Sequence, residues 1–440
     1  MKQNLWLLLC CLFFLPTANA QTKQCLGNEP SSELRKVEAL EPLPMDRKRG
    51  YKPAWMALER RYRSAVLNWS DDVIRERYLE NRNTYLDVHM YHERLRRIQE
   101  KYPDDIEVWE IARTHFDFPV YAILVGESQS AEKADVLHLG AIHGNELLAV
   151  NYTLDALETV LSESSDVVKN IRSRFNLWFV PMFNPDGNWL SMRRAHADSY
   201  GKKNGRNTDG TCETFGYEGI DLSKNFPKRN QSVEFEPETQ GLINLIESRK
   251  FITALSFHSG GEGLYTPSLL PTEKEGDRLL ISSFIDDIQQ GNPSWEIAPL
   301  HRNTDSREIV WLHQQKGIPA FMFDYPNEVA PMTDVIRSAA REQASLFMTL
   351  FWQSLEERSY VTGVVVDQQG EPIQAKIRLT KGKRDEHVWE TLDNGQFALI
   401  FPSKDVFTLH IDMEGYVSAQ KKIDLRSGMT QARIVLRKEE

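Results

Sequence analysis

Two histidines and a glutamate in this chain are spaced so that they can hold one metal ion. An apolar run from Val136 predicts a buried strand that leads directly into His143-Gly-Asn-Glu146. A second apolar run ends at His258, which offers a third ligand. Two His, one Glu and an open position form the ligand set of hydrolytic zinc sites. The sequence therefore predicts one Zn²⁺ on His143, Glu146 and His258, and a hydrolytic reaction.

The elements that must position these ligands alternate between strands and helices over residues 86–357. Nearly continuous apolar runs predict strands that are buried on both faces, with helices between them. These runs are residues 120–125, 136–140, 177–183, 254–258 and 320–324. We therefore expect an α/β sheet with helices on both faces. Ligands of such sheets bind at the carboxyl ends of the strands, which is where His143, His258 and Asp324 fall.

The pattern changes at residues 358–440, where short strands are separated by turns such as Asp393-Asn-Gly395. This predicts a small all-β sandwich after the α/β domain. At the other end, residues 21–85 are expected to form a helical N-terminal extension, which is either a brace on the main domain or a propeptide that blocks the site.

Residues 1–20 have the form of a secretory signal, with one lysine, an apolar run and Ala18-Asn-Ala20 before the expected cleavage site. We expect an exported protein, periplasmic or secreted, with no membrane association after cleavage. Cys25 and Cys212 would remain, and an oxidising compartment allows one disulfide between them. The formal net charge of −10 argues against nucleic acid as a partner.

Several motifs in this order resemble the M14-type zinc metallocarboxypeptidases. They are Tyr91-His-Glu-Arg-Leu, His143-Gly-Asn-Glu146, Phe183-Asn-Pro-Asp-Gly187, Asp221-Leu-Ser-Lys-Asn-Phe-Pro227 and Glu236-Pro-Glu-Thr239. The resemblance implies a mixed sheet, zinc on the three ligands named above and a peptide substrate. It also implies that Arg206 stabilises the oxyanion, with Lys203 as a competing candidate. The tail resembles the transthyretin-like module of the regulatory-type carboxypeptidases.

Three departures from the family pattern concern catalysis and substrate binding. Ser223-Lys224 stands where the family has the Asn-Arg pair that binds the terminal carboxylate, and Asp324 stands where it has the catalytic glutamate. The family's substrate tyrosine has no counterpart. Lysine keeps a positive charge but lacks the bidentate fork of arginine. Aspartate has the acid–base chemistry of glutamate with a reach about 1.5 Å shorter.

These residues predict an exported zinc metallopeptidase that hydrolyses a C-terminal peptide or amide bond of a non-standard substrate. Asp324 would accept the proton, and Glu308 and Glu328 are the alternative bases. A second hypothesis is a non-catalytic relative that binds zinc or a peptide. In a third, the β-sandwich is the working part, as an adhesion or carbohydrate module.

Overall fold

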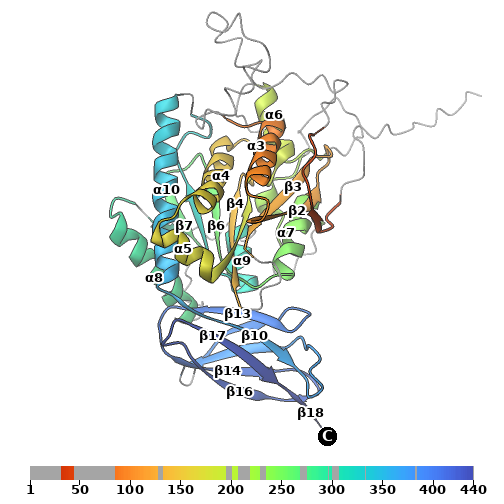
Figure 1. Ribbon diagram of the computed structural model, residues 1–440. Coiled ribbons are helices and arrows are strands. Elements are labelled where there is room, and N and C mark those ends of the chain that lie inside the picture. Colours follow the sequence, from red (N-terminus) through yellow and green to blue (C-terminus); the bar gives the residue numbers. More distant parts are fainter. Residues whose placement is uncertain are drawn as a thin grey trace, which may run out of the picture.

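The computed structural model describes residues 31–43, 85–126, 132–194, 201–206, 219–227, 234–267, 275–295, 297–299, 307–331, 333–381 and 384–439. An α/β body carries a smaller all-β part at one end (Figure 1). The body begins with α3 (Val88–Lys101), whose first turn is capped by the Asp87 side chain accepting from the backbone N–H of Met90.

A nine-stranded mixed sheet forms the centre of the body, in the order β1-β2-β3-β5-β4-β6-β9-β7-β8. The middle strands β5, β4, β6 and β9 run parallel, whereas β1, β2 and β3 pair antiparallel at one edge. The strands are β1 (Arg35–Val37), β2 (Ile106–Arg113), β3 (Pro119–Val125), β4 (Ala134–Gly140), β5 (Phe175–Val180), β6 (Phe251–His258), β7 (Gly263–Thr266), β8 (Ile297–Pro299) and β9 (Ala320–Asp324).

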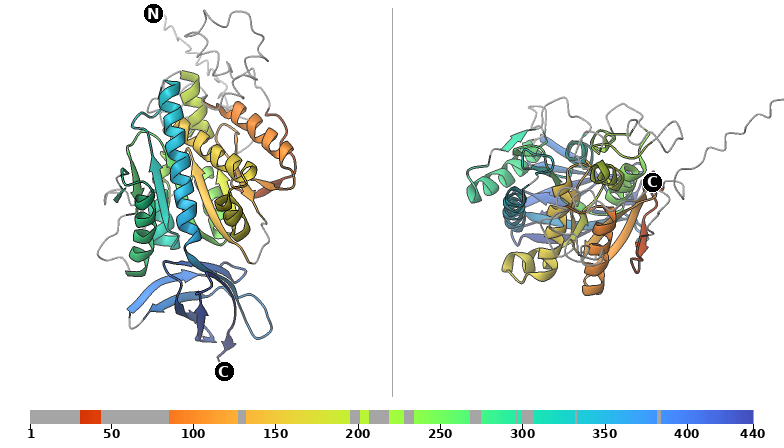
Figure 2. Two further views of the ribbon diagram at one scale, coloured as in Figure 1. Left: turned by 60° about the vertical axis from the view of Figure 1, so that its left-hand side comes forward. Right: turned by 90° about the horizontal axis from the view of Figure 1, so that it is seen from above.

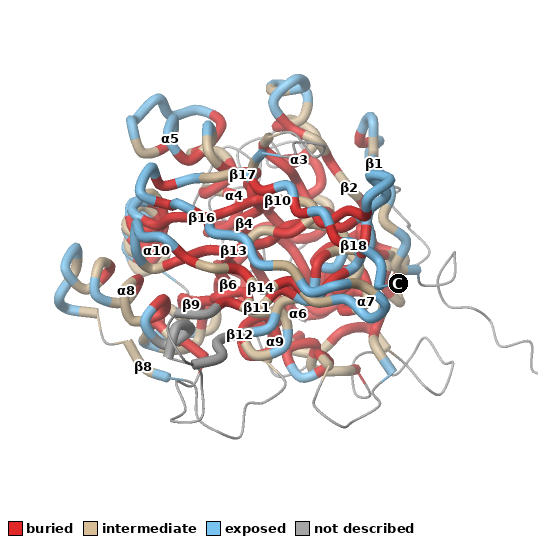
Figure 3. The backbone as a smooth tube through the Cα atoms, turned by 90° about the horizontal axis from the view of Figure 1, so that it is seen from below, coloured by how far each residue is buried: buried red, intermediate tan, exposed pale blue. Residues whose placement is uncertain are grey.

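Helices cover both faces of this sheet, which confirms the predicted fold class. One core cluster contains residues of α3, α4 (Leu147–Ser162), α5 (Asp166–Arg174), α8 (Glu275–Gly291) and α10 (Asp334–Glu356). The other contains residues of α7 (Pro237–Glu247) and α9 (Glu308–Lys316). The central strands are buried because their side chains meet helices on both sides (Figure 3).

The all-β part consists of a three-stranded sheet, β13-β10-β17, a four-stranded sheet, β12-β11-β14-β16, and the short pair β15-β18. The two larger sheets share one hydrophobic core. The strands are β10 (Ser359–Val366), β11 (Lys376–Lys381), β12 (Arg384–Glu390), β13 (Gln396–Phe401), β14 (Val406–Asp412), β15 (Tyr416–Val417), β16 (Ala419–Asp424), β17 (Met429–Val435) and β18 (Arg437–Lys438).

The all-β part packs directly against the amino-terminal ends of the central strands (Figure 2). The Thr362 hydroxyl donates to the carbonyl of Glu132, just before β4, at 3.2 Å. Tyr360 is fully buried in the core of the α/β body, where its ring lies 5.0 Å from that of Phe175. Arg174 donates to the carbonyls of Glu356 and Arg358 at the junction. The two parts therefore share buried side chains.

The described part of the N-terminal extension, residues 31–43, contains the edge strand β1. The rest of the expected helical extension, the signal peptide and both remaining cysteines lie outside the described residues. Within the described parts of the chain, no helix is long and apolar enough to cross a membrane.

Candidate metal centre

A sharp turn at the end of β4 carries the first two ligands. Ala141 has a φ of 54°, a left-handed conformation that redirects the chain from the strand toward α4. Gly140 precedes it, and a Cβ on this residue would lie 2.3 Å from the Thr153 hydroxyl of α4. Close packing of strand and helix thus places His143 and Glu146 in the connecting loop, above the sheet edge.

The Asn-Pro-Asp-Gly motif supports this loop. Asn184 donates from its backbone N–H to the carbonyl of Ala141 and from its side chain to the carbonyl of Ile142. Its side-chain oxygen accepts from the backbone N–H of Gly187. A Cβ on Gly144 would lie 2.2 Å from this same turn, so only glycine fits there. The motif is therefore a support for the ligand loop.

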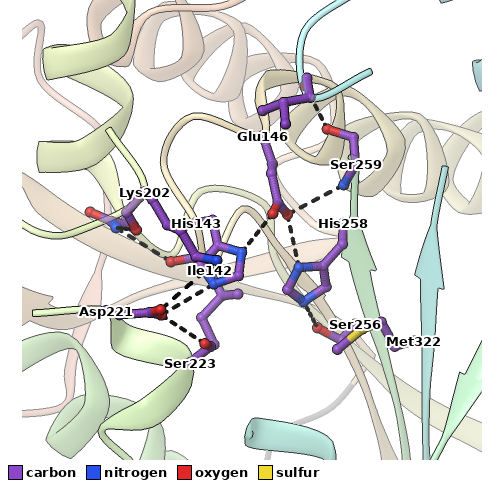
Figure 4. A network of polar contacts seen from close by, with 12 residues as sticks. Ile142, His143, Glu146, Lys202, Asp221, Ser223, Ser256, His258, Ser259 and Met322 are labelled. Atoms are coloured by element: carbon purple, nitrogen blue, oxygen red, sulfur yellow. Dashed lines mark hydrogen bonds and ion pairs between the residues drawn. The ribbon is translucent and has the colours of Figure 1, made fainter. Parts of the chain in front are cut away.

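The three predicted ligands lie together and are buried (Figure 4). His143 Nδ1 lies 2.6 Å from Glu146 Oε1, and His258 Nδ1 lies 2.8 Å from Glu146 Oε2. All the ligand atoms are within 4.8 Å of one another. Two imidazole nitrogens and a carboxylate turned toward each other fit Zn²⁺, for which His and Glu are common ligands.

The electrostatics of the group favour an ionised carboxylate. Burial by itself would raise the pKa of Glu146, but the imidazoles of His143 and His258 outweigh it and hold that pKa well below its usual range. Burial would lower the pKa of His258, yet the carboxylates of Glu146 and Glu308 raise it well above its usual value. The site therefore keeps a carboxylate ready as a metal ligand.

A carboxylate also contacts the outward-facing nitrogen of each histidine. His143 Nε2 lies 3.2 Å from Asp221 Oδ1, and His258 Nε2 lies 3.0 Å from Glu308 Oε1. These contacts leave the Nδ1 atom of each ring directed at the centre, which is the arrangement that orients histidine ligands in metal sites. Glu308 is fully buried, and its Oε1 atom already contacts His258. Both observations argue against Glu308 as the alternative base that activates water.

Asp324 ends β9 directly beside His258, because the two residues are register partners in parallel strands. Its carboxyl packs on Gly261, where a Cβ would lie 2.6 Å away. Its Oδ1 atom is buried without a hydrogen-bond partner among the described residues. Burial raises the pKa of Asp324, although His258 opposes this shift. A partly desolvated carboxyl at this edge has the properties of a general base. Glu328, the other alternative base, is exposed.

The two predicted substrate residues differ in their surroundings. Both lie on the short 3-10 helix η2 (Leu222–Lys224). Ser223 is buried, and its hydroxyl donates to Asp221 Oδ1 at 2.7 Å, so it supports His143 indirectly. The side chain of Lys224 is 66% exposed, with its Nζ 3.4 Å from Asp221 Oδ2. Lys224 is thus the one of the pair that can meet a substrate.

Arg206 has carboxylate partners away from the three ligands. Its Nη1 donates to Glu236 Oε1 at 2.7 Å and its Nη2 to Glu234 Oε2 at 3.2 Å. Glu236 is buried and also lies 2.6 Å from His115 Nε2. Among the described residues, Arg206 forms no hydrogen bond or ion pair with His143, Glu146 or His258, so its predicted role rests on the family pattern.

Sequence reasoning overlooked two residues of the centre. Asp221 lies in one of the family motifs without a predicted role, and Lys202 lies outside all of them. Lys202, which is drawn with Asp221 in Figure 4, has its Nζ 3.9 Å from Asp221 Oδ2. With Lys224, two lysines therefore flank this carboxylate. A signal for Asp221 was available, because a carboxylate beside a cluster of metal ligands is a common partner for a histidine ring.

Comparisons with known proteins agree with this geometry. Residues 91–278 match the family model described as zinc carboxypeptidase, Peptidase M14. Mast cell carboxypeptidase A of Homo sapiens is 24% identical over 209 residues, 41% of this chain and 47% of the relative. Carboxypeptidase D of Drosophila melanogaster is 24% identical over 184 residues, 37% of this chain and 12% of the relative. The chain spans about half the length or less of these curated relatives.

Solved structures share the fold. Thrombin activatable fibrinolysis inhibitor superposes with a TM-score of 0.53 at 14% identity, covering 62% of this chain and 74% of that one. Carboxypeptidase A from Helicoverpa armigera gives a TM-score of 0.50 at 16% identity, covering 62% and 73%. Residues 91–278 therefore match the zinc carboxypeptidase domain of the M14 family, and the geometry of the three candidate ligands agrees with this match.

Proposed function

We propose that this chain is an exported zinc metallopeptidase that hydrolyses a C-terminal peptide or amide bond of a non-standard substrate. The observation that carries the proposal is the buried group of His143, Glu146 and His258, with their ligand atoms facing one another. The family match supports a hydrolase of this class. When bound, zinc supplies a Lewis acid that polarises a carbonyl and lowers the pKa of a water molecule.

The chain's own residues would divide the remaining work. Asp324, beside His258 at the same sheet edge, would accept a proton from the attacking water and return it to the leaving group. Arg206 remains the candidate oxyanion donor, with Glu236 holding one side of its guanidinium. We also propose that residues 358–440 are a transthyretin-like module outside the chemistry, since the metal group lies at the opposite end of the central strands.

Lys224 is the reason to expect a non-standard substrate. An ammonium binds a carboxylate as a point charge, without the two parallel hydrogen bonds of an arginine. The loss is about 1–3 kcal/mol on the scale of charged hydrogen bonds, or roughly ten- to hundredfold in affinity. We therefore expect weak discrimination between peptides that end in a free carboxylate and peptides that end in an amide.

The decisive experiment measures zinc content and hydrolysis of a mixed peptide pool by mass spectrometry. Wild type should hold about one zinc and shorten peptides from the C-terminus. Asp324→Asn should keep zinc and lose about 10²–10⁴-fold in rate, whereas Glu328→Gln, an exposed carboxylate four residues away, is the matched control. Glu146→Ala should lose zinc, because two protein ligands make a poor site.

Three outcomes would count against parts of this proposal. Absence of zinc from folded wild-type protein would refute the metal centre. Bound zinc with no cleavage of any peptide would favour the non-catalytic alternative. Full activity in Asp324→Asn would remove Asp324 as the base. For Lys224, the change Lys224→Arg should raise the preference for a free C-terminal carboxylate over an amide about tenfold, and an unchanged preference would exclude a role in recognition.

A further inference from the structure

We propose that Glu308, together with Ser256, is a positioning element for the metal ligand His258, and that the pair sets the zinc affinity of the centre. The proposal rests on the metal site described above but not on the hydrolytic reaction. It gives Glu308 a function different from that of a catalytic base.

The contacts form a closed triangle beneath the His258 ring. Glu308 Oε1 lies 3.0 Å from His258 Nε2 and accepts from the Ser256 hydroxyl at 2.9 Å. Ser256 Oγ is itself 3.1 Å from His258 Nε2. Because the serine proton points to the carboxylate, its oxygen is free to accept, and the Nε2–H of His258 has two acceptors. This arrangement selects the tautomer with the Nδ1 lone pair toward the ligand group.

The fold explains why these three side chains meet. Ser256 and His258 are two residues apart on β6, so their side chains leave the same face of the strand. Glu308 is the first residue of α9, where the N-terminus of a helix favours a negative charge. Figure 4 shows Ser256 beneath the His258 ring, on the side away from Glu146.

Because Glu308 is buried, its contact with His258 Nε2 contributes more to stability than it would in water. Glu308 is fully buried, and its Oε2 atom has no hydrogen-bond partner among the described residues. A carboxylate in this setting is stable only beside a positive or strongly polarised donor. His258 with a metal on its Nδ1 atom would be such a donor, since the ion would draw charge from the ring and strengthen the hydrogen bond that Nε2–H donates to Glu308. Asp221 holds the equivalent position on His143.

The test is the zinc dissociation constant, measured by competition with a chromogenic chelator on the full chain. Glu308→Gln keeps the shape of the side chain but removes its charge, and should weaken zinc binding ten- to hundredfold. Ser256→Ala should weaken it less, by severalfold. The matched control is Glu238→Gln, which changes another fully buried glutamate of the same domain that has no contact with the three ligands.

Folded Glu308→Gln protein that binds zinc as tightly as wild type would overturn the proposal, as would an equal loss in Glu238→Gln. If Glu308→Gln does not fold, Ser256→Ala decides: the proposal fails if the zinc dissociation constant of Ser256→Ala equals that of wild type. Because the readout is metal affinity, a weaker site in Glu308→Gln supports the positioning role even if no peptide is ever cleaved. If Glu308→Gln weakens zinc binding as expected but the wild-type protein cleaves no peptide, only the proposed function is contradicted.

Discussion

His138 should make the stability of the α/β body fall in acid, and its hydrogen bonds show why. This fully buried residue of β4 stacks on Phe179 with ring centroids 4.5 Å apart. Its Nε2 accepts from the indole N–H of Trp352 at 3.1 Å, and its Nδ1 faces the carbonyl of Trp178 at 3.2 Å. The indole can only donate, so the ring must be neutral, with its proton on Nδ1.

A second proton on this ring would point at the indole N–H. Burial, which is opposed by the contact with the Trp178 carbonyl, therefore lowers the pKa of His138 to about 3, from 6.5. Between these two pH values the unfolded chain binds a proton at this position and the folded protein does not. The contribution of neutral His138 to the free energy of unfolding is thus fully present above pH 6.5. As the pH falls below 6.5, the free energy of unfolding decreases by about 1.4 kcal/mol per pH unit. The total loss is on the order of 4 kcal/mol near pH 3.5.

The assay is urea unfolding of wild type and His138→Gln from pH 4.5 to 7.5, in one chelator-containing buffer so that metal linkage does not contribute. At pH 7.5 the free energy of unfolding of His138→Gln should be about 1–3 kcal/mol lower than that of wild type, because the substitution disturbs a buried hydrogen bond. This difference should shrink by about 1.4 kcal/mol per pH unit below 6.5, because only wild type has a buried imidazole that destabilises the folded state in acid. A deficit that stays constant across this range would refute the reasoning.

Three further predictions probe other parts of the molecule. Gly261→Ala places a Cβ 2.6 Å from the Asp324 carboxyl, so hydrolysis should fall about 10²-fold while the zinc content, measured in parallel, stays normal. Tyr360→Ala empties a fully buried position where the all-β part meets the body and should lower the free energy of unfolding by about 3–5 kcal/mol; a loss below 1 kcal/mol would mean that the two parts are not coupled. Glu236→Gln, at a buried ion pair, should cost about 1–3 kcal/mol in urea unfolding, whereas Glu234→Gln, at its exposed neighbour, should cost under about 0.5 kcal/mol.

Much of the fold was predictable because apolar runs mark buried strands. The run at residues 320–324 coincides with β9, and the M14 resemblance supplied the mixed sheet. Strands without such runs were missed. The short edge strand β1 has only three residues, and β12, Arg-Asp-Glu-His-Val-Trp-Glu, is mostly charged. Edge and surface strands gain their pairing from neighbours in space, which no local pattern records.

The grouping of the candidate ligands was predictable for a similar reason: His143 follows β4 and His258 ends β6, and the carboxyl ends of these two parallel strands share one sheet edge. The carboxylates that contact the Nε2 atoms of these two histidines were not predictable. Glu308 is 50 residues from His258 along the chain, and it reaches that ring only because α9 begins beneath β6. The residues around Glu308 resemble any helix start with an acidic residue. For this reason the sequence predicted Glu308 only as an alternative base.

The contact of the all-β part with the amino-terminal ends of the central strands has a practical consequence. The described chain finishes at residue 439 on that part, while the ligand group lies at the opposite ends of the strands. An affinity handle or a solid support joined after this point would hold the molecule with its metal-bearing edge facing outward. Immobilisation in this way should therefore leave the predicted metal site as accessible as it is in solution, so that the proposed binding of zinc and of peptides can be measured on a biosensor surface.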